Sequence, residues 1–496
     1  MFSSFPSAPT LLLIIAFFVA LSTWLIPSGK FDEISYQKGL NTFLVQSEKG
    51  AHEFSATQEV LDSFQVKIPL QKFKDGSIWK PIAIPGTYHV IDSKPQGIVS
   101  FLKSPIQGMM GAFDVILFVL IIGGFIGIVQ FSGAFDAGIG SLATLLKGRE
   151  PLLIVFVSTL IAIGGTTFGL AEETIAFYPI LLPVFLAARY DVIVALATIY
   201  LGSSVGTMIS TVNPFSAIIA SNAAGISWTE GLGTRAIFLI VAQFVTMAYV
   251  IRYAERVRKN PELSIVSGQR EIHQNMYGNK SEQLITLNGS RTIILLLFLG
   301  SFLIMILGVS LWQWWFTEMT VLFLCSSVLI GIFSRIGEKK FIDQFVKGAS
   351  ELLNVALIIG IARGITWLMD EGQISSTLLY WASESVKDVP SWLFINILLF
   401  VYAFLSFFIP SSSGLAVMSM PVMAPLADVV EIDRYLVVNA YQYGMGLMAF
   451  ITPTGLILAS LAMVQVSYDK WLKFVIPLLI MITLLTMIVL TIEVLF

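Results

Sequence analysis

The chain is a succession of long apolar runs separated by short polar segments. A run of about 20 apolar residues is long enough to cross a bilayer as a helix. The apolar runs lie near residues 11–26, 111–131, 151–163, 168–187, 192–224, 235–251, 292–310, 316–333, 352–369, 392–409, 415–427, 435–465 and 473–495. This pattern predicts an all-α polytopic membrane protein.

Two pairs of neighbouring runs are divided by short polar or glycine-rich stretches, at residues 164–167 and 410–414. The run 151–163, which opens the first pair, is too short to cross a bilayer. Each pair therefore predicts a re-entrant hairpin, which enters the membrane and leaves on the same side. The two hairpins cover residues 151–187 and 392–427.

Two other runs are too long for one span and are interrupted at residues 211–214 and 452–454. Each interruption contains a proline, which removes a backbone donor and clashes with the preceding turn. We interpret runs 192–224 and 435–465 as helices broken in mid-membrane. The whole chain then has about nine transmembrane helices plus two hairpins.

The two halves of the chain repeat one another at an offset that stays between 239 and 245 residues. Residues about 107–241 and 347–481 are therefore two copies of one unit. The matching residues are Asp114 with Asn354, Gly124 with Gly364, Gly169 with Gly414, Pro179 and Pro183 with Pro421 and Pro425, Asp191 with Asp433, Asn213 with Thr452, and Ile226 with Val466.

The remaining segments complete the organisation. Residues 1–27 form a retained transmembrane helix, because no positive charge precedes the apolar run and no small-residue cleavage site follows it. Residues 28–107 are polar with short β-prone runs, and predict a strand-rich extracytoplasmic insert whose His89 and scattered lysines form a solvated face. Residues 108–252 and 336–496 hold the repeats, residues 253–290 a cytoplasmic loop, and residues 291–335 a connecting helix pair.

Charge sets the orientation. With the N-terminus in the cytoplasm, the short inner loops and flanks hold sixteen Lys and Arg residues and the short outer segments hold three. The positive-inside rule favours this arrangement, with the C-terminus extracytoplasmic and the chain in the inner (cytoplasmic) membrane. The two repeats then run in opposite directions through the membrane. Two inverted repeats whose hairpins and broken helices meet near the midplane are typical of secondary transporters.

Composition excludes several other classes. Of the 496 residues, 56% are hydrophobic and 12% are charged, and the net charge is −3 with no basic patch suited to nucleic acid. The single cysteine, Cys325, allows neither an intrachain disulfide nor a thiolate metal cluster. His52, His89 and His273 lie outside the apolar runs, which argues against an intramembrane zinc hydrolase. A GxxxxGK[ST] nucleotide loop does not occur in the sequence, so we expect neither ATP-driven transport nor a cofactor.

Glu172 and Glu173 are the principal candidate site residues. They are adjacent carboxylates within the otherwise apolar stretch 164–183. A charge at bilayer depth costs roughly 2.5–3.5 kcal/mol on insertion scales, so such a carboxylate is a functional candidate by default. The alternative is a pair of glutamates that only holds local structure at a wet hairpin tip.

The hairpin tips and helix breaks supply the other candidates. Irregular backbone at membrane depth is tolerated only where it is buried or lines a cavity, and hydroxyls with free carbonyls can coordinate Na⁺. For any single hydroxyl, the alternative is back-bonding to its own helix. We predict substrate or ion binding by Thr166, Thr167, Thr211, Asn213, Ser411, Ser412, Ser413, Thr452 and Thr454. The candidate Na⁺ ligands among them are Thr166, Asn213, Ser412 and Thr452.

Arg363 is the only basic residue deep within an apolar run of the sequence. A buried arginine needs a partner, and its planar fork suits a carboxylate. Its candidate partners are Glu172, Glu173, Asp114 and the substrate. An internal salt bridge and a substrate contact are equally consistent with the sequence.

The sequence also resembles a known family. The stretches 25–32 (LIPSGKFD), 169–183 (GLAEETIAFYPILLP) and 210–215 (STVNPF) are similar to the YfcC-like branch of the C4-dicarboxylate anaerobic carrier (DcuC) family. The resemblance covers nearly the whole chain. It implies a homodimer, a scaffold part and a transport part in each protomer, and elevator-like movement with substrate and cation bound at the hairpin tips and helix breaks. Members of the branch are described either as dicarboxylate carriers or as basic amino acid antiporters.

Three functions remain open at this point. An amino acid, basic amino acids included, suits Glu172 and Glu173 better than a dicarboxylate, because two cargo carboxylates would be repelled by two glutamates. A Na⁺- or H⁺-coupled C4-dicarboxylate carrier is the alternative, since a cation on the glutamates removes that repulsion. A channel is the alternative from another class. An enzyme is not expected, because the apolar runs contain no nucleophile and base pair.

Overall fold

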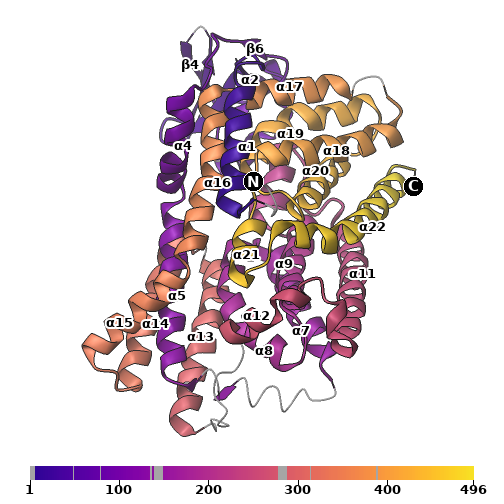
Figure 1. Ribbon diagram of the computed structural model, residues 1–496. Coiled ribbons are helices and arrows are strands. Elements are labelled where there is room, and N and C mark those ends of the chain that lie inside the picture. The colour runs from indigo at the N-terminus through magenta and orange to yellow at the C-terminus, as the bar shows by residue number, and fades with distance from the viewer. Residues whose placement is uncertain are drawn as a thin grey trace.

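The computed structural model describes residues 6–48, 50–76, 78, 80–134, 137–138, 149–277, 288–312, 314–386 and 389–495. It is an all-α bundle with a small sheet-containing insert at one end (Figure 1). The insert lies at the top of Figure 1 and α12 (Arg270–Tyr277) lies near the opposite end. The two segments that the sequence places on opposite sides of the membrane are thus far apart.

Every predicted apolar run contains a helix. Within the described residues, eight helices are long and apolar enough to cross a membrane: α5 (Phe113–Phe131), α7 (Pro151–Phe168), α11 (Leu232–Lys259), α14 (Phe316–Phe333), α16 (Leu353–Gly372), α18 (Ser391–Phe408), α19 (Ser412–Val429) and α22 (Tyr468–Leu495). Shorter apolar helices include α1 (Ala8–Ser22) and α9 (Val192–Met208). Further helices of the bundle include α8 (Tyr178–Ala187), α13 (Gly289–Trp312) and α20 (Arg434–Ala449). The predicted fold class is confirmed.

Both predicted helix breaks are present. In the first repeat, α9 ends at Met208, and the chain resumes as a π-helix, η2 (Pro214–Ile218), followed by α10 (Ile219–Ala223). In the second repeat, α20 ends at Ala449 and α21 (Ile457–Val464) follows. The prolines at the breaks, Pro214 and Pro453, have no N–H to continue the helical ladder, which explains why the helices stop there.

The first hairpin differs from the prediction in one respect. Residues 164–167 were expected to form its turn, but α7 continues through them to Phe168 and is long enough to span a membrane. The reason is close packing on α9: a Cβ on Gly165 would lie 2.9 Å from the Ser203 carbonyl oxygen. Small residues permit this approach of two helices. The turn follows at Gly169, whose φ of +78° lies in the left-handed region that glycine favours.

The helices that were not predicted include α4 (Ile98–Gly111), α15 (Glu338–Glu351) and α17 (Ser375–Ser385). The first ten residues of α4 fall within the stretch that the sequence assigned to the insert. The helices α4 and α15 precede α5 and α16 at equivalent positions of the two repeats. The helix α4 packs against α16, and α15 packs against α5.

Glycines make this reciprocal packing possible. A Cβ on Gly108 of α4 would overlap the backbone of Gly360 and Gly364 in α16. A Cβ on Gly348 of α15 would overlap the backbone of Gly123 in α5, and Gly127 lies beside it. Gly108 and Gly348 are 240 residues apart, which is the offset of the repeat. The two repeats are therefore joined by matching glycine contacts.

The helices form two groups in Figure 1. One group contains α1, α4, α5, α13, α14, α15 and α16, in which α1 and α4 pack on α16, α14 and α15 pack on α5, and α13 packs on α14. The other group contains α7, α9, α11, α18, α19, α20 and α22. In it, α7 packs on α9, α18 on α20, and α9 on α20. We call these the left group and the right group, after their places in Figure 1.

The insert contains a four-stranded antiparallel sheet in the order β4-β3-β2-β5 and a two-stranded pair, β1 with β6. The strands are β1 (Gly29–Lys30), β2 (Glu33–Gln37), β3 (Thr42–Ser47), β4 (Gly50–Ser55), β5 (Ile82–Ala83) and β6 (His89–Val90). Two short helices, α2 (Gln58–Ser63) and α3 (Leu70–Lys74), cover the sheet through Leu61 and Phe73, which are buried with Phe43. The predicted strand-rich insert is confirmed.

Candidate functional site

Thr166 joins the first hairpin to the first helix break. Its hydroxyl donates to the Ile209 carbonyl oxygen at 2.9 Å and accepts from the Thr211 amide at 2.9 Å. The Thr166 carbonyl oxygen accepts from the Thr211 and Val212 amides, each at 3.2 Å. The break therefore has partners for its free backbone groups in the hairpin, as buried irregular backbone requires.

Asn213 fastens the same junction. Its Oδ1 accepts from the Phe215 amide at 2.8 Å, which caps the π-helix, and its Nδ2 donates to Ser210 Oγ at 3.2 Å. The Asn213 amide group also packs on Gly169, where a Cβ would lie 3.0 Å from it. Gly169 thus serves both the turn and this contact. By contrast, the Thr167 hydroxyl donates at 2.6 Å to Ile163 O of its own helix.

Glu172 and Glu173 lie at the tip of the first hairpin, where they open a 3₁₀ helix, η1 (Glu172–Phe177). Both residues are partly exposed. Glu173 Oε2 accepts from the Ala171 amide at 3.1 Å. Within the part of the chain that the structure describes, neither carboxylate has a Lys, Arg or His partner within 4.0 Å. The tip therefore presents two adjacent carboxyl groups without a basic partner among the described residues.

The second hairpin tip is formed by three serines. The Ser411 hydroxyl caps α19 by accepting from the Gly414 amide at 3.2 Å. The Ser412 carbonyl oxygen accepts from the Tyr441 hydroxyl at 2.7 Å, which ties the tip to α20. The Ser413 hydroxyl accepts from Lys80 Nζ at 3.3 Å.

At the second helix break, Thr452 and Thr454 share a hydroxyl–hydroxyl hydrogen bond of 2.7 Å, and Thr454 donates to Phe407 O at 2.9 Å. Aromatic donors occupy the freed carbonyls nearby. The Ala449 oxygen accepts from the Tyr200 hydroxyl at 2.6 Å and the Phe450 oxygen from Trp471 Nε1 at 2.9 Å. These carbonyls already have protein partners.

Each hairpin contacts the broken helix of the other repeat. In one direction, η1 and α8 pack against α21. In the other, α19 packs against η2 and α10. The first hairpin tip also contacts the left group of helices, since η1 packs on α5 and the Phe177 ring centroid lies 5.6 Å from that of Phe302 in α13. The helices that carry the candidate residues of one repeat therefore pack against those of the other repeat.

At the level of side chains, the candidates form separate pairs. Hydrogen bonds join Thr166 with Thr211 and Thr452 with Thr454. Among the described residues, none of the hydrogen bonds joins a candidate of the first repeat to one of the second. The candidate Na⁺ ligands Thr166, Asn213 and Thr452 are buried and each already has a protein partner, while Ser412 is partly exposed. Binding by these residues stays a prediction.

Of the two alternatives that the sequence left open for Arg363, the described residues do not show the internal salt bridge. Its side chain is exposed on α16, and in the described structure it has no ion pair with Glu172, Glu173 or Asp114. Asp114 instead accepts from Trp315 Nε1 at 3.2 Å.

The deeply buried arginine is Arg235, which is 0% exposed and donates to Trp228 O and, at 3.4 Å, to Asn439 Oδ1. The sequence does not single out Arg235, because it lies at the edge of its apolar run, where helix ends are normally exposed to water.

The insert lysines were expected to be solvated, but three of them reach the bundle. Besides the Lys80 contact, Lys72 Nζ donates to Asn222 Oδ1 at 2.6 Å, and Lys67 pairs with Asp428 at 2.8 Å. Asp428 also pairs with Arg434 at 2.6 Å. Only three-dimensional pairing across more than 140 residues reveals these contacts, so no local sequence signal could have indicated them.

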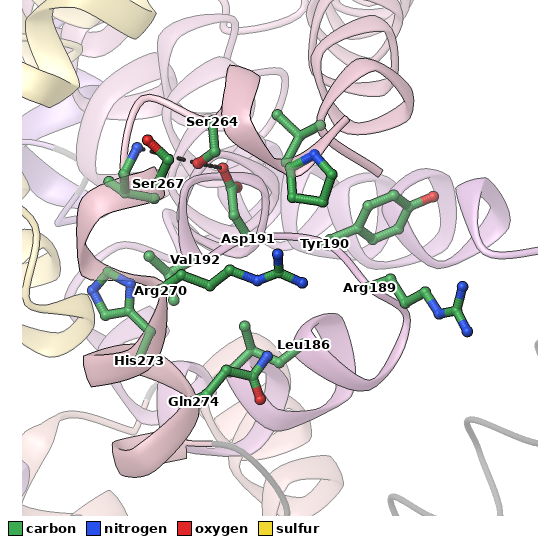
Figure 2. A pocket seen from close by; sticks show the side chains of 13 residues that line it. Leu186, Arg189, Tyr190, Asp191, Val192, Ser264, Ser267, Arg270, His273 and Gln274 are labelled. Carbon is green, nitrogen blue, oxygen red and sulfur yellow. Dashed lines mark hydrogen bonds between the residues drawn. The ribbon is translucent and has the colours of Figure 1, made fainter. Parts of the chain in front are cut away.

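A cavity of about 100 Å³ lies at the end of the molecule opposite the insert. Figure 2 shows its lining, in which Ser264 donates to the Asp191 carboxylate at 2.6 Å and the Arg270 and His273 side chains lie beside them. Tyr253 also donates to Asp191, at 2.8 Å. This cavity contains none of the candidate residues, and its polar groups fasten the loop after α11 to the start of α9.

Burial sets the protonation of two groups in this cavity. It raises the pKa of the Asp191 carboxyl, opposed by the hydrogen bonds from Ser264, Val194 and Tyr253. Burial lowers the pKa of the His273 imidazole, opposed by the Gln465 backbone. His273 is 2% exposed, and its Nε2 has no hydrogen-bond partner among the described residues. Both groups are therefore biased toward their neutral forms.

The family profile of the C4-dicarboxylate anaerobic carriers (DcuC) matches residues 5–495. The chain belongs to this family. An uncharacterized protein of Haemophilus influenzae is 44% identical over 96% of this chain and 94% of its own length. A protein of Escherichia coli described as a putative basic amino acid antiporter, YfcC, is 28% identical over 93% of this chain and 91% of its own. As a member of this family, the chain is a transporter and not an enzyme.

Two solved structures are also similar over nearly their full length. The YdaH transporter of Alcanivorax borkumensis is 12% identical to this chain, with a TM-score of 0.40, and the match covers 98% of both chains. MtrF of Neisseria gonorrhoeae, described among antimetabolite efflux pumps, is 14% identical to this chain, with a TM-score of 0.40. The match covers 99% of this chain and 96% of MtrF.

Proposed function

We propose that the protein is a secondary active transporter that moves a small carboxylate-bearing metabolite, and that this cargo is an amino acid, with basic amino acids as the first candidates. Transport is coupled to Na⁺ or H⁺ or proceeds by exchange. The protein works in the inner membrane as a homodimer, with its N-terminus in the cytoplasm and its C-terminus outside.

The unpaired carboxylates of Glu172 and Glu173 carry this proposal. They lie at a hairpin tip, partly exposed, with no basic partner within 4.0 Å among the described residues. Placing a dicarboxylate beside them brings like charges together, which is unfavourable in a low dielectric. An ammonium or guanidinium group supplies the missing opposite charge. The description of the Escherichia coli relative as a putative basic amino acid antiporter supports the same cargo class.

The two groups of helices support an elevator-type mechanism. The right group contains or packs against both hairpins and both broken helices. The left group is held together by the glycine contacts of α4 with α16 and of α15 with α5. We propose that the right group carries the cargo past the left group. The η1 contact with α5 then slides during each cycle.

The second candidate is a Na⁺- or H⁺-coupled C4-dicarboxylate carrier. The family description and the exposed Arg363 guanidinium favour it, because an arginine fork binds a carboxylate well. In that case a cation bound at Glu172 and Glu173 neutralises the hairpin tip. The two candidates therefore assign opposite roles to the same glutamates.

Ligand-induced thermal stabilisation of the purified protein separates the two candidates. Each ligand, from a panel of arginine, ornithine, alanine, succinate and fumarate, is added in Na⁺ and in choline buffer. A ligand at about 100 times its Kd stabilises the folded state by ~2.7 kcal/mol, which is a measurable shift of the unfolding temperature. A shift with amino acids supports the proposal. A shift confined to dicarboxylates in Na⁺ makes the second candidate correct.

A further inference from the structure

A second cavity, of about 360 Å³, lies where the insert meets the bundle. We call it the outer pocket. Four segments line it: residues 29–33 and 80–83 of the insert, residues 369–376 at the end of α16 and the start of α17, and residues 414–418 of α19. Its volume is within the range of small-molecule sites. It contains part of the second hairpin, yet none of the glutamates of the first.

The outer pocket contains charges of both signs. Lys30 and Lys80 supply two ammonium groups, and Glu33 and Asp370 supply two carboxylates. Burial lowers the pKa of Lys80 and raises the pKa of Glu33, which Lys30 opposes. Both pKa shifts arise because the two groups are partly removed from water. A ligand charge of opposite sign would therefore interact with them more strongly here than on an open surface.

Gln373 adds a buried acceptor. Its Oε1 is buried and has no hydrogen-bond partner among the described residues. The backbone around it is fixed, because the Gln373 carbonyl oxygen accepts from the Gly29 amide at 3.0 Å and Ser28 Oγ donates to the Gly372 oxygen at 2.8 Å. A buried acceptor without a donor costs free energy, so it marks a position where a ligand N–H is favoured.

The outer pocket is connected to the second hairpin tip. Lys80 Nζ donates to Ser413 Oγ at 3.3 Å, and Gly414 next to it lines the pocket. The pocket also touches the left group through Met369 and Asp370 of α16. A ligand there would therefore contact the insert, the hairpin and the left group of helices at the same time.

We propose that the outer pocket is a binding site for a free α-amino acid on the face that carries the insert. The cargo carboxylate binds between Lys80 and Lys30, and its α-ammonium binds among Glu33, Asp370 and Gln373 Oε1. A zwitterion satisfies both sets of charges, whereas a dicarboxylate satisfies only the lysines. This inference rests on the proposed function, and it adds the insert to the substrate path with Lys80 as a specificity-determining residue.

Site-specific labelling tests binding without requiring transport. Cys325 is the only cysteine of the chain, so Cys325→Ser with Ser376→Cys places a single thiol in the outer pocket. The rate of its reaction with a maleimide is measured on purified protein with and without arginine, alanine or succinate. We expect both amino acids to slow the reaction and succinate not to. A second variant, Cys325→Ser with Lys74→Cys at an exposed lysine of the insert, supplies the control thiol whose reaction no ligand slows.

Substitutions then assign the protection to the pocket. In the Ser376→Cys background, Lys80→Ala and Glu33→Gln should each raise the amino acid concentration that halves the labelling rate. We expect a rise of about tenfold, which corresponds to ~1.4 kcal/mol of binding free energy. Lys80→Arg should preserve protection, which excludes a general folding defect. Lys74→Ala, an exposed lysine of the same insert, is the matched control.

The outcomes separate this inference from the proposed function. If proteoliposomes transport amino acids but no amino acid protects the thiol, or if Lys80→Ala leaves protection unchanged, the outer pocket is not a binding site and the proposed function stands. Protection by succinate alone overturns the amino acid assignment of this site. If amino acids protect the thiol but are not transported, the proposed function is wrong and the outer pocket is a ligand site of another role.

Discussion

The hydroxyl groups of Thr166 and Thr211 lie 3.1 Å apart, across the junction between the first hairpin and the first helix break. The second repeat has a corresponding junction, in which Thr454 donates to Phe407 O at 2.9 Å. In both repeats a threonine hydroxyl thus joins a hairpin limb to a broken helix. These contacts hold irregular backbone where water is scarce.

Thr166→Val should destabilise this junction at nearly constant side-chain volume. It removes the hydroxyl that donates to the Ile209 carbonyl oxygen, and it leaves the part-buried Thr211 amide with only the Thr166 carbonyl oxygen as its acceptor. We expect a loss of about 1–3 kcal/mol of unfolding free energy. Thr167→Val is the matched control, since that hydroxyl only back-bonds to its own helix, and should stay within about 0.5 kcal/mol. Unfolding in detergent measures both. Equal effects would contradict the role given to Thr166.

Gly108→Ala should destabilise the left group of helices, because the new methyl group would overlap the backbone of α16. Overpacking of this kind costs about 1–3 kcal/mol. Gly348→Ala should behave alike, as its counterpart in the second repeat. Gly300→Ala in α13 is the control, since nothing lies within 4 Å of its new Cβ, and it should gain about 0.5–1 kcal/mol from helix propensity. Tolerance of both Gly108→Ala and Gly348→Ala would contradict the reciprocal packing.

Arg363→Ala should leave the unfolding temperature unchanged and lower transport of carboxylate-bearing cargo, because the guanidinium is exposed and unpaired in the described structure. Arg235→Ala should instead destabilise the protein by about 3 kcal/mol or more, since it removes the buried donor to Trp228 and Asn439. Thermal unfolding and uptake are measured on both variants. Unfolding of Arg363→Ala would support a structural salt bridge that the described residues do not show.

The stability of the protein should fall on acidification through His273. Burial lowers the pKa of this imidazole in the folded state, so the unfolded state binds the proton more readily below about pH 6.5 and stability decreases with falling pH. Asp191 and Lys470 are the charged neighbours that act on it. The unfolding temperature is compared between about pH 7.5 and pH 5.5. His273→Gln should reduce this dependence and exposed His52→Gln should not. Equal slopes in all three proteins would contradict the assignment.

The sequence predicts the architecture well because membrane helices and repeats are local or periodic signals. Run length identifies the helices, proline positions locate both breaks, and the constant offset reveals the two copies. Residues 164–167 were misassigned because Gly165 is there for packing on α9 rather than for a turn. The amphipathic α15 was missed because its apolar face is narrow and its partner, α5, lies more than 200 residues away in sequence.

The candidate site was less predictable than the fold. Thr166, Thr211, Asn213, Thr452 and Thr454 do lie at the two junctions, yet the backbone partners that occupy them could not be read from the sequence. Lys80 and Arg235 were missed because their significance depends on tertiary contacts, with Ser413 and with Trp228 and Asn439. Charge on a polar insert is normally solvated, so nothing local distinguishes Lys80 from its neighbours.

The paired carboxylates Glu172 and Glu173 are tested most directly by counterflow of labelled arginine and of labelled succinate into proteoliposomes. The wild type is compared with Glu172→Gln, Glu173→Gln and, as a control, exposed Glu59→Gln. We predict arginine counterflow in the wild type and in Glu59→Gln, and a loss of at least about tenfold in both hairpin variants, with expression intact. Normal arginine counterflow in both hairpin variants, or counterflow of succinate alone in the wild type, would contradict an amino acid transporter built around these two glutamates.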